Sequence, residues 1–376
     1  MADDTPFASV EIEGINIQAM VESIDVEDHD RAIDRARVVF DSADDISKIV
    51  REQSKVKISL GWSTEKAFIF EGIVMGVKNE ALGTGQQRVT VTAYDLSYRM
   101  RQNQSSDRFF SSGKLSDALK KIVSDYTKDG IRSGQIVPDP DPTFTPDTHW
   151  GKVKGKSDWD FIQEAAIKWK ARAFVEVNNN TSQFYFVSEK SLLKGAPMGL
   201  LHYCPGGVGP LIEFKYQRAA SGASPASTIT VVDPQTGDPV TKQVTPPPPE
   251  PPLQVDPNAD EQLAQAADIM AKASGKPEDA RPKTSVSGMP SDPIKAEQDI
   301  QQDPTRILGF YGNGVARGTI MLRAKGKVTI QGIAPWAEGD WYVHKVNHVY
   351  TRIAVTDKKM RQQDRSTYQT KFSATR

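Results

Sequence analysis

The sequence is poor in cysteine, which excludes two ways of stabilising a fold. Its 376 residues include a single cysteine, Cys204, so the chain can form neither an internal disulfide nor a metal centre with several thiolate ligands. The neighbouring Pro205, Gly206 and Gly207 supply no base that would activate the thiol. We therefore expect a buried thiol rather than a nucleophile at this position.

Long apolar segments are also missing. Acidic residues interrupt the first 21 residues, so these do not provide the apolar core of a secretory leader. The longest uncharged stretch, residues 195–212, contains three prolines and five glycines, which predicts a loop rather than a membrane span. Together these features predict a chain that folds in the cytoplasm and does not insert into a membrane.

Neither sign of charge dominates the chain as a whole. There are 47 Lys and Arg residues against 48 Asp and Glu residues, so no overall field attracts nucleic acid. The two ends differ, because residues 1–50 hold thirteen acids and four bases, whereas residues 305–376 hold thirteen bases and four acids. Either the ends neutralise each other inside one fold, or they form two charged faces that meet different neighbours. The sequence leaves both readings open.

Residues that could carry chemistry lack the partners that the chemistry needs. His344 and His348 would share one face of a strand, but no third metal ligand is near in the sequence. Asp158 and Asp160 fit the acidic first turn of a helix better than an acid–base pair. A calcium loop would need a glycine turn and a distal glutamate, which are absent around the three aspartates Asp139, Asp141 and Asp147. We therefore assign no catalytic, cofactor-binding or metal-binding residue and expect no enzyme.

The first hundred residues alternate polar and apolar side chains, which is the pattern of half-buried strands. The segments with this pattern are residues 9–13, 35–40, 56–60, 68–77 and 88–93. Gly83-Thr84-Gly85 fits a hairpin turn between the last two segments, and Trp62 is expected to close a turn after the third. Their spacing is typical of a small β-barrel or sandwich.

An amphipathic helix interrupts this strand pattern. Apolar residues at helical spacing predict a helix over residues 114–128. Either Ser111 or Ser112 would serve as the N-cap, and Gly130 lies just past the end, where helices commonly stop.

A second helix is predicted over residues 158–170. Ser157 precedes it and is the expected N-cap. Residues 173–177 and 183–188 then alternate around a polar, asparagine-rich loop, so this pair of segments predicts a hairpin.

Proline is concentrated in one part of the chain. Residues 234–257 contain nine prolines, a composition that favours a stiff extended conformation and excludes a place in a central sheet. A short helix is predicted after Pro257, ending at Gly275, and residues 276–304 are expected to cross a surface. The proline-rich segment could be a ligand for a signalling module, but a spacer is the preferred reading.

Two more strands are predicted at the C-terminal end, over residues 339–348 and residues 368–376. In the first, strict alternation places Trp341 and Val343 on one face and Val346 on the other. The second is expected to close a sheet.

These two segments resemble the end of the late-control D family of phage tail proteins. There a Gly-x-Trp-x-Val-x-x-Val-x-His strand is followed by a Tyr-x-Thr-x-Phe-x-Ala-x-Arg strand, and both patterns occur here. Earlier fragments agree in order, namely a Phe-x-Gly-x-Val strand, a strand that ends in an aspartate, and the start of a middle helix. The positions that carry the resemblance are Phe70, Gly72, Asp95, Trp159, Phe161, Gly339, Trp341, Val343, His348, Tyr368 and Phe372.

The resemblance implies a mainly β protein with minor α (α+β), in which helical and hairpin insertions interrupt two β-barrel-like hub domains. The family is similar to the hubs of contractile injection machines, including the N-terminal part of VgrG. It therefore implies a homotrimeric baseplate hub, without a cofactor, that adapts a hexameric tail tube to a spike. Its partners would be the tail tube or tube-initiator protein, a separate trimeric spike protein and other baseplate components, with no specific nucleic acid. A separate spike is expected because the last strand ends at Arg376. The particle would be a virion tail or contractile machine assembled in the bacterial cytoplasm.

Four regions follow from this reading. They are a first barrel-like domain over residues 1–104, a helical and hairpin region over 105–217, a proline-rich linker with a short helix over 218–304, and a C-terminal β segment over 305–376 that completes the second barrel. Two other functions stay open. One is a peptidoglycan-degrading hub enzyme, which would need a carboxylate pair in a cleft, and the other is a cargo effector or adhesin, which would be monomeric.

Overall fold

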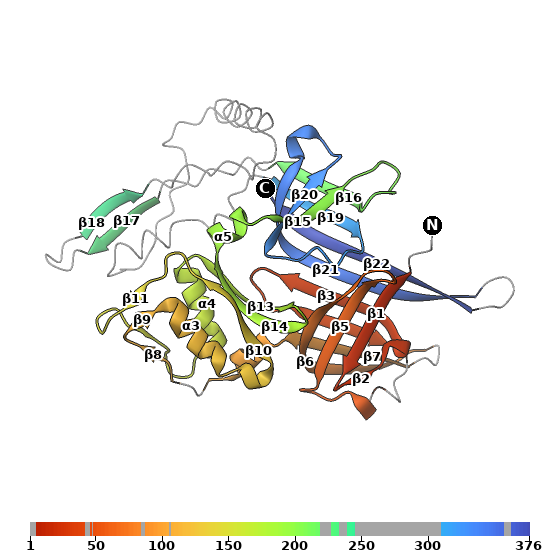
Figure 1. The fold of residues 1–376 in the computed structure, drawn as a ribbon, viewed down its shortest axis with the longest axis horizontal. Helices are drawn as coiled ribbons and strands as arrows, with labels where there is room; N and C mark the ends of the chain where they lie inside the picture. The colour runs from red at the N-terminus through yellow and green to blue at the C-terminus, as the bar shows by residue number, and fades with distance from the viewer. Residues whose placement is uncertain are drawn as a thin grey trace.

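The computed structural model describes residues 5–41, 46, 48–83, 87–104, 107–218, 227–232, 239–244, 310–356 and 362–376. Its largest element is a sheet of thirteen strands, which curls into two barrel-like parts beside a smaller part that contains the helices (Figure 1). The fold is mainly β with minor α, as predicted. Among the described residues, no helix is both long and apolar enough to cross a membrane.

The first barrel is built from the N-terminal strands. They lie in the order β3-β4-β7-β6-β5-β1, and every neighbouring pair is antiparallel. Their bounds are β1 Pro6–Ile12, β3 Val21–His29, β4 Arg35–Phe40, β5 Lys55–Trp62, β6 Lys66–Ala81 and β7 Gln87–Asp95. The short strand β2 (Ile15–Asn16) and the 3-10 turn η1 (Gln18–Met20) join β1 to β3. Alternate side chains such as Val10 and Ile12 are fully buried, so the predicted strand pattern is confirmed here.

The second barrel is built mostly from C-terminal strands. Their bounds are β15 Pro197–His202, β16 Leu211–Arg218, β19 Phe310–Arg317, β20 Gly326–Gln331, β21 Gly339–Thr356 and β22 Gln362–Thr375. The 3-10 turn η4 (Pro335–Ala337) lies between β20 and β21. The strand order is β15-β20-β21-β22-β19-β16, and a bridge between Tyr203 and Leu211 brings the two edges back together. This enclosure surrounds a core that includes Trp341 and Phe372.

The long hairpin of β21 and β22 belongs to both barrels. Near its base it pairs with β20 and β19 of the second barrel. Farther along, residues 345–351 of β21 pair with β3 of the first barrel, and β22 lies beside β1. Tyr350 and Tyr368, on this part of the hairpin, pack into the core of the first barrel. Main-chain hydrogen bonds therefore run without interruption from one barrel into the other.

One expectation for β21 is wrong. Alternation placed Val346 on the face opposite Trp341 and Val343, but all three side chains lie in the core of the second barrel. The pairing with β22 shifts between Val343 and Lys345, so the register passes over His344. Such a bulge adds one residue and moves every later side chain to the other face.

The middle part packs helices on a three-stranded sheet. Strands β10 (Ile131–Val137), β13 (Ala171–Asn178) and β14 (Thr181–Ser188) lie in the order β10-β14-β13. Helix α3 (Leu115–Ser124) packs on β10 and α4 (Asp158–Lys168) on β13. The remaining elements are α2 Ser97–Gln102, β8 Phe109–Phe110, β9 Gly113–Lys114, η2 Thr127–Asp129, β11 Thr143–Phe144, β12 Trp150–Gly151 and α5 Glu189–Lys194. The predicted hairpin is confirmed by the pairing of β13 with β14.

The two predicted helices are present, but only one has the predicted cap. The hydroxyl of Ser157 accepts a first-turn N–H of α4 at 3.0 Å, as expected. The cap predicted for α3 at Ser111 or Ser112 is wrong. Instead the carboxylate of Asp141 accepts the N–H of Ser116 at 3.0 Å. This aspartate from the proline-containing connector therefore caps a helix.

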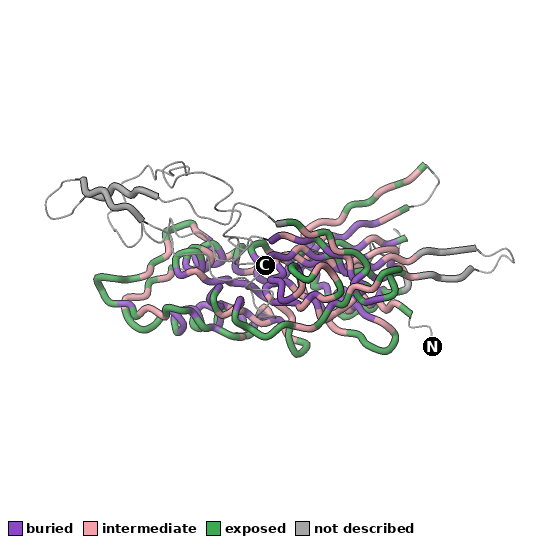
Figure 2. Tube along the Cα trace, turned by 90° about the horizontal axis from the view of Figure 1, so that it is seen from above, coloured by how far each residue is buried: buried purple, intermediate pink, exposed green. Residues whose placement is uncertain are grey.

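Each part has a hydrophobic core of its own, and Figure 2 shows the buried residues along the middle of the molecule. Outside these parts, the structure describes β17 (Ser227–Val232) and β18 (Pro239–Val244), which pair as a separate hairpin. The expected extended spacer therefore contains a strand pair, and its Pro239 stands at the start of a strand, where proline is tolerated. The helix predicted after Pro257 lies outside the described residues.

Candidate functional site

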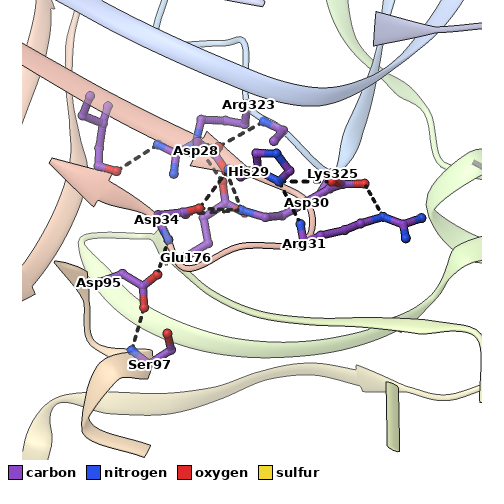
Figure 3. A network of polar contacts seen from close by, with 12 residues as sticks. Asp28, His29, Asp30, Arg31, Asp34, Asp95, Ser97, Glu176, Arg323 and Lys325 are labelled. Carbon is purple, nitrogen blue, oxygen red and sulfur yellow. Dashed lines mark hydrogen bonds and ion pairs between the residues drawn. The ribbon is translucent and has the colours of Figure 1, made fainter. Parts of the chain in front are cut away.

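The most unusual site in the described residues is a buried group of charges where the three parts meet (Figure 3). We call it the joint and define it by six residues: Asp28, Asp34, Asp95, Glu176, Arg323 and Lys325. The first three come from the strand ends of the first barrel, and Glu176 comes from β13 of the middle part. The two cations lie just before β20 of the second barrel. A charge buried this deeply is costly unless it is paired.

Lys325 holds the centre of the joint. Its side chain is 1% exposed, and its ammonium group contacts the carboxylate of Asp28 and lies 3.3 Å from that of Asp34. Burial alone would lower the pKa of Lys325, but the surrounding carboxylates raise it above its ordinary value. The lysine is therefore charged throughout the physiological range.

Arg323 links all three parts through one guanidinium group. Its Nε lies 3.1 Å from the carboxylate of Asp28 and 2.8 Å from that of Glu176. Its Nη1 donates to the main-chain oxygen of Ile69 in β6 at 3.0 Å. Burial alone would raise the pKa of Asp28, yet Lys325 and Arg323 hold it below its ordinary value.

Asp95 fixes the positions of two neighbouring main-chain groups in the joint. Its carboxylate accepts the N–H of Asp34 at 2.7 Å and the N–H of Ser97, at the start of α2, at 2.6 Å. It therefore connects the end of β7 both to the segment before β4 and to the first helix. Burial raises the pKa of Asp95 to about 6 in spite of these hydrogen bonds. Burial also raises the pKa of Asp34 well above its ordinary value, although Lys325 opposes the effect.

A second buried cluster continues from the joint toward α5. Arg172 of β13 lies 3.8 Å from the carboxylate of Asp30 and 2.5 Å from that of Glu189. Burial raises the pKa of Glu189 above its ordinary value. Arg172 acts in the opposite direction but is the weaker effect. Tyr342 of β21 is fully buried. Burial raises the pKa of this tyrosine, and Asp30 adds to the effect. The middle part is thus tied to the first barrel by more than one charged contact.

Asp158 stabilises the middle part from within. The sequence predicted a simple first-turn acid, but the side chain is fully buried between Arg108 at 2.7 Å and Lys152 at 2.8 Å. The hydroxyl of Tyr126 donates to the same carboxylate at 2.6 Å. Asp158 is therefore an internal ion-pair centre as well as a helix-start residue. The two cations are needed because the carboxylate is buried; a carboxylate on the surface would not need them.

The residues that carry the family resemblance do not converge on one pocket. Asp95 lies in the joint, while Phe70 packs in the first core and Trp159 and Phe161 in the middle core. Those in the second-barrel core are Trp341, Val343 and Phe372. Gly72 and Gly339 stand where a side chain would meet, respectively, the main-chain oxygen of Tyr94 and the guanidinium of Arg376. These positions are therefore spread over the cores and the crowded backbone of all three parts.

His348 and Tyr368 form the remaining motif pair. They lie on β21 and β22, and the histidine Nδ1 is 2.9 Å from the tyrosine hydroxyl. Burial lowers the pKa of His348 to about 3, so the imidazole is neutral at physiological pH. His344 is only partly buried, and no cluster among the described residues could hold a metal ion. Cys204 was expected to be buried and is instead partly exposed.

Five of the six joint residues were not singled out from the sequence. The opposite charges of the two ends of the chain hinted at four of them, and nothing pointed to Glu176. The structure favours internal neutralisation for the residues concerned, because Asp28 meets Arg323 and Lys325, and Glu27 meets Lys345. The pairing depends on strands that lie nearly 300 positions apart, so no local pattern marks it.

No protein-family model and no curated protein sequence matches this chain. Solved structures do. The chain is similar to a 43 kDa tail protein of prophage MuSo2 from Shewanella oneidensis, with a TM-score of 0.65 at 10% identity, covering 99% of this chain and 98% of that one. This chain has the phage tail-protein fold. A tail protein from Neisseria meningitidis is similar over 99% of this chain and 97% of its own, with a TM-score of 0.61 at 11% identity.

The tail-protein fold extends to secretion machines. The E. coli c3393 protein, a component of the type VI secretion system, is similar at a TM-score of 0.53 and 10% identity, covering 97% of this chain and 76% of that protein. The fold expected from the sequence motifs is therefore confirmed. The similar structures have the names of tail and secretion-system proteins rather than of enzymes.

Proposed function

We propose that this protein is a structural hub of a phage tail or a related injection machine. The observation that carries the proposal is the likeness to two phage tail proteins over nearly the whole length of both partners. The joint and the shared hairpin add a physical reason, because a hub must keep its two barrels in one arrangement. Interlocked barrels with a shared ribbon and buried ion pairs suit this task.

The mechanism we propose is geometric rather than catalytic. Two barrels in each subunit would let a homotrimer present six similar surfaces to a hexameric tail tube, while its other end keeps three-fold symmetry for a spike. The shared hairpin of β21 and β22 supports this idea, because it fixes the two barrels relative to each other. Partners would be the tube or tube-initiator protein, a separate spike protein and other baseplate components, in the tail of the particle.

The four regions predicted from the sequence become part of this proposal, with two adjustments. Residues 197–218 would belong to the second barrel rather than to the middle region, because β15 pairs with β20 and β16 with β19. The boundary at residue 104 separates the first barrel from the middle part, and residues 218–304 form the linker region. Residues 305–376 would serve both barrels rather than one, because β21 pairs with β3 as well as with β20.

The test of subunit number is the molar mass of the purified protein, measured by light scattering. We expect three times the mass of one chain over a range of concentrations. A stable monomer would favour a cargo effector or adhesin. A second assay addresses the enzymatic alternative: release of soluble fragments from purified peptidoglycan would contradict the non-catalytic proposal, and the proposal expects no release above a buffer control.

A further inference from the structure

The joint holds more negative than positive charge. Four carboxyl groups, from Asp28, Asp34, Asp95 and Glu176, surround the two cations Arg323 and Lys325. The three aspartates are 1–6% exposed, so water cannot screen them well. If all four carboxyl groups were ionised, two negative charges would have no partner within the joint.

The surplus charge lies across the boundary between the first barrel and the middle part. A small cavity at this boundary is lined by Asp34, Asp95 and Arg323, by Glu71 of β6, and by Glu176 and Ser182 of the middle part. The hydroxyl of Ser182 donates to Glu71 at 2.6 Å, which is the closest polar contact across the cavity. Repulsion among ionised carboxylates here would push the two parts away from each other.

We propose that the joint is a proton-operated clamp, which binds a proton on Asp34 or Asp95 in mild acid and loosens the middle part from the first barrel when that proton is lost. The proton replaces a missing counter-charge. In the protonated state the surplus over Arg323 and Lys325 falls from two negative charges to one, which weakens the repulsion within the joint. In the deprotonated state the unbalanced charge lies on the first-barrel side, on Asp34 and Asp95, and it faces the carboxylate of Glu176 on the middle part across the cavity.

The pKa shifts of Asp95 and Asp34 have the direction that this proposal needs. Burial raises the pKa of Asp95 from 3.8 to about 6, and burial raises the pKa of Asp34 further above its ordinary value. A carboxyl group with a raised pKa binds its proton more tightly in the folded protein than in the unfolded chain. Its contribution to stability is therefore complete below the unfolded pKa and is lost as the pH rises through the folded pKa. For Asp95 this window runs from about pH 4 to about pH 6.

Among the residues that the structure describes, the nearby cations Arg172 and Lys57 have acidic partners outside the six joint residues. Arg172 is engaged with Asp30 and Glu189. Lys57 lies 4.0 Å from Glu71, at the outer side of the cavity. The groups that face the joint come from every element packed on it. They are His29 at the end of β3, Asp30 and Arg31 after it, Lys57 of β5, Glu71 of β6, Arg172 of β13, Tyr185 of β14, Tyr342 and His348 of β21, and Tyr368 of β22.

The test must report on the boundary rather than on overall stability. His348 is buried with a pKa lowered to about 3, so acid destabilises the fold at that residue while it strengthens the joint. We therefore choose a distance measurement between spin labels on the two parts. In a Cys204→Ser background, labels at the exposed positions Glu52 and Lys120 report on the first barrel and on the middle part.

We expect the distance distribution to be narrow at pH 5 and broader or longer at pH 8. The variants Asp95→Asn and Asp34→Asn, which imitate the protonated state, should remove this difference, and either one that folds is sufficient. Glu65→Gln, an exposed change of the same charge, should keep it. An unchanged distribution between pH 5 and pH 8, or the same pH response in both joint variants, would overturn the proposal.

Discussion

Trp62 of the first barrel donates its indole N–H to the main-chain oxygen of Gly318, 256 positions away in the sequence, at 2.6 Å. Gly318 directly follows β19 of the second barrel, and a side chain there would collide with the ring of Tyr368. The guanidinium of Arg317 also lies over the Trp62 ring, 4.3 Å from its centre. One indole therefore joins the two barrels through a hydrogen bond and a cation–π contact, at a point remote from the joint.

Replacing Trp62 with phenylalanine should weaken this connection. The Trp62→Phe change keeps a ring but removes the donor, which leaves the oxygen of Gly318 without its indole partner. A lost hydrogen bond of this kind costs about 1 kcal/mol in the free energy of unfolding, measured by urea denaturation. Trp336→Phe, at a residue that is 39% exposed, is the matched control and should cost less. Equal effects of the two changes would contradict a special role for Trp62.

Lys325→Met should be much more harmful. The change leaves the buried carboxylate of Asp28 without its closest cation, and breaking a buried ion pair in this way costs roughly 3–5 kcal/mol. The control is Lys345→Met. Lys345 is paired with Glu27, and the lysine side chain is 40% exposed. Exposed pairs contribute about 0–1 kcal/mol. Chemical denaturation of both variants tests this, and a Lys325 variant as stable as the Lys345 variant would refute the importance of the joint.

The closing strand β22 should be essential for the second barrel. Phe372→Ala removes a buried ring that packs on Phe214, and the cavity should cost about 3–5 kcal/mol. Lys371→Ala changes the neighbouring exposed residue and serves as the control, with an expected loss below about 0.5 kcal/mol. Deleting residues 368–376 should leave an unpaired edge and cause aggregation. A truncated protein that stays soluble and oligomeric would show that this strand is dispensable.

Limited proteolysis should cut first between about residues 220 and 304. This prediction rests on the composition of the segment, which is rich in proline and poor in apolar residues. The fragments, identified by mass spectrometry, should retain both flanking sheets. If cleavage occurs first within the barrels while this region resists, the segment must be packed in the assembly.

Local patterns predicted the local structure well. The strands of the first barrel follow from alternation, and the cap of α4 follows from Ser157, because both depend on neighbours in sequence. The β13–β14 hairpin has Asn179 and Asn180 at positive φ in its turn. This is a conformation that asparagine tolerates better than most residues, so composition alone located the turn.

The joint and the bulge could not be read from the sequence, for different reasons. Asp28 and Lys325 become partners only when β3 and the segment before β20 meet, and nothing near either residue encodes that meeting. No residue type marks the bulge at His344. Alternation counted through it therefore predicts the wrong face for Val346. The cap of α3 was missed because Asp141 reaches it from another segment. Tertiary contacts decide all three features.

A density map of the purified particle tests the central claim most directly. If the protein is a tail hub, three copies of the two-barrel structure should fit as one ring at the end of the tail tube, with the shared β21–β22 ribbons fixed within each subunit. A particle whose map has no density for these barrels between tube and spike, or contains the chain only as a single copy inside the tube, would contradict the account.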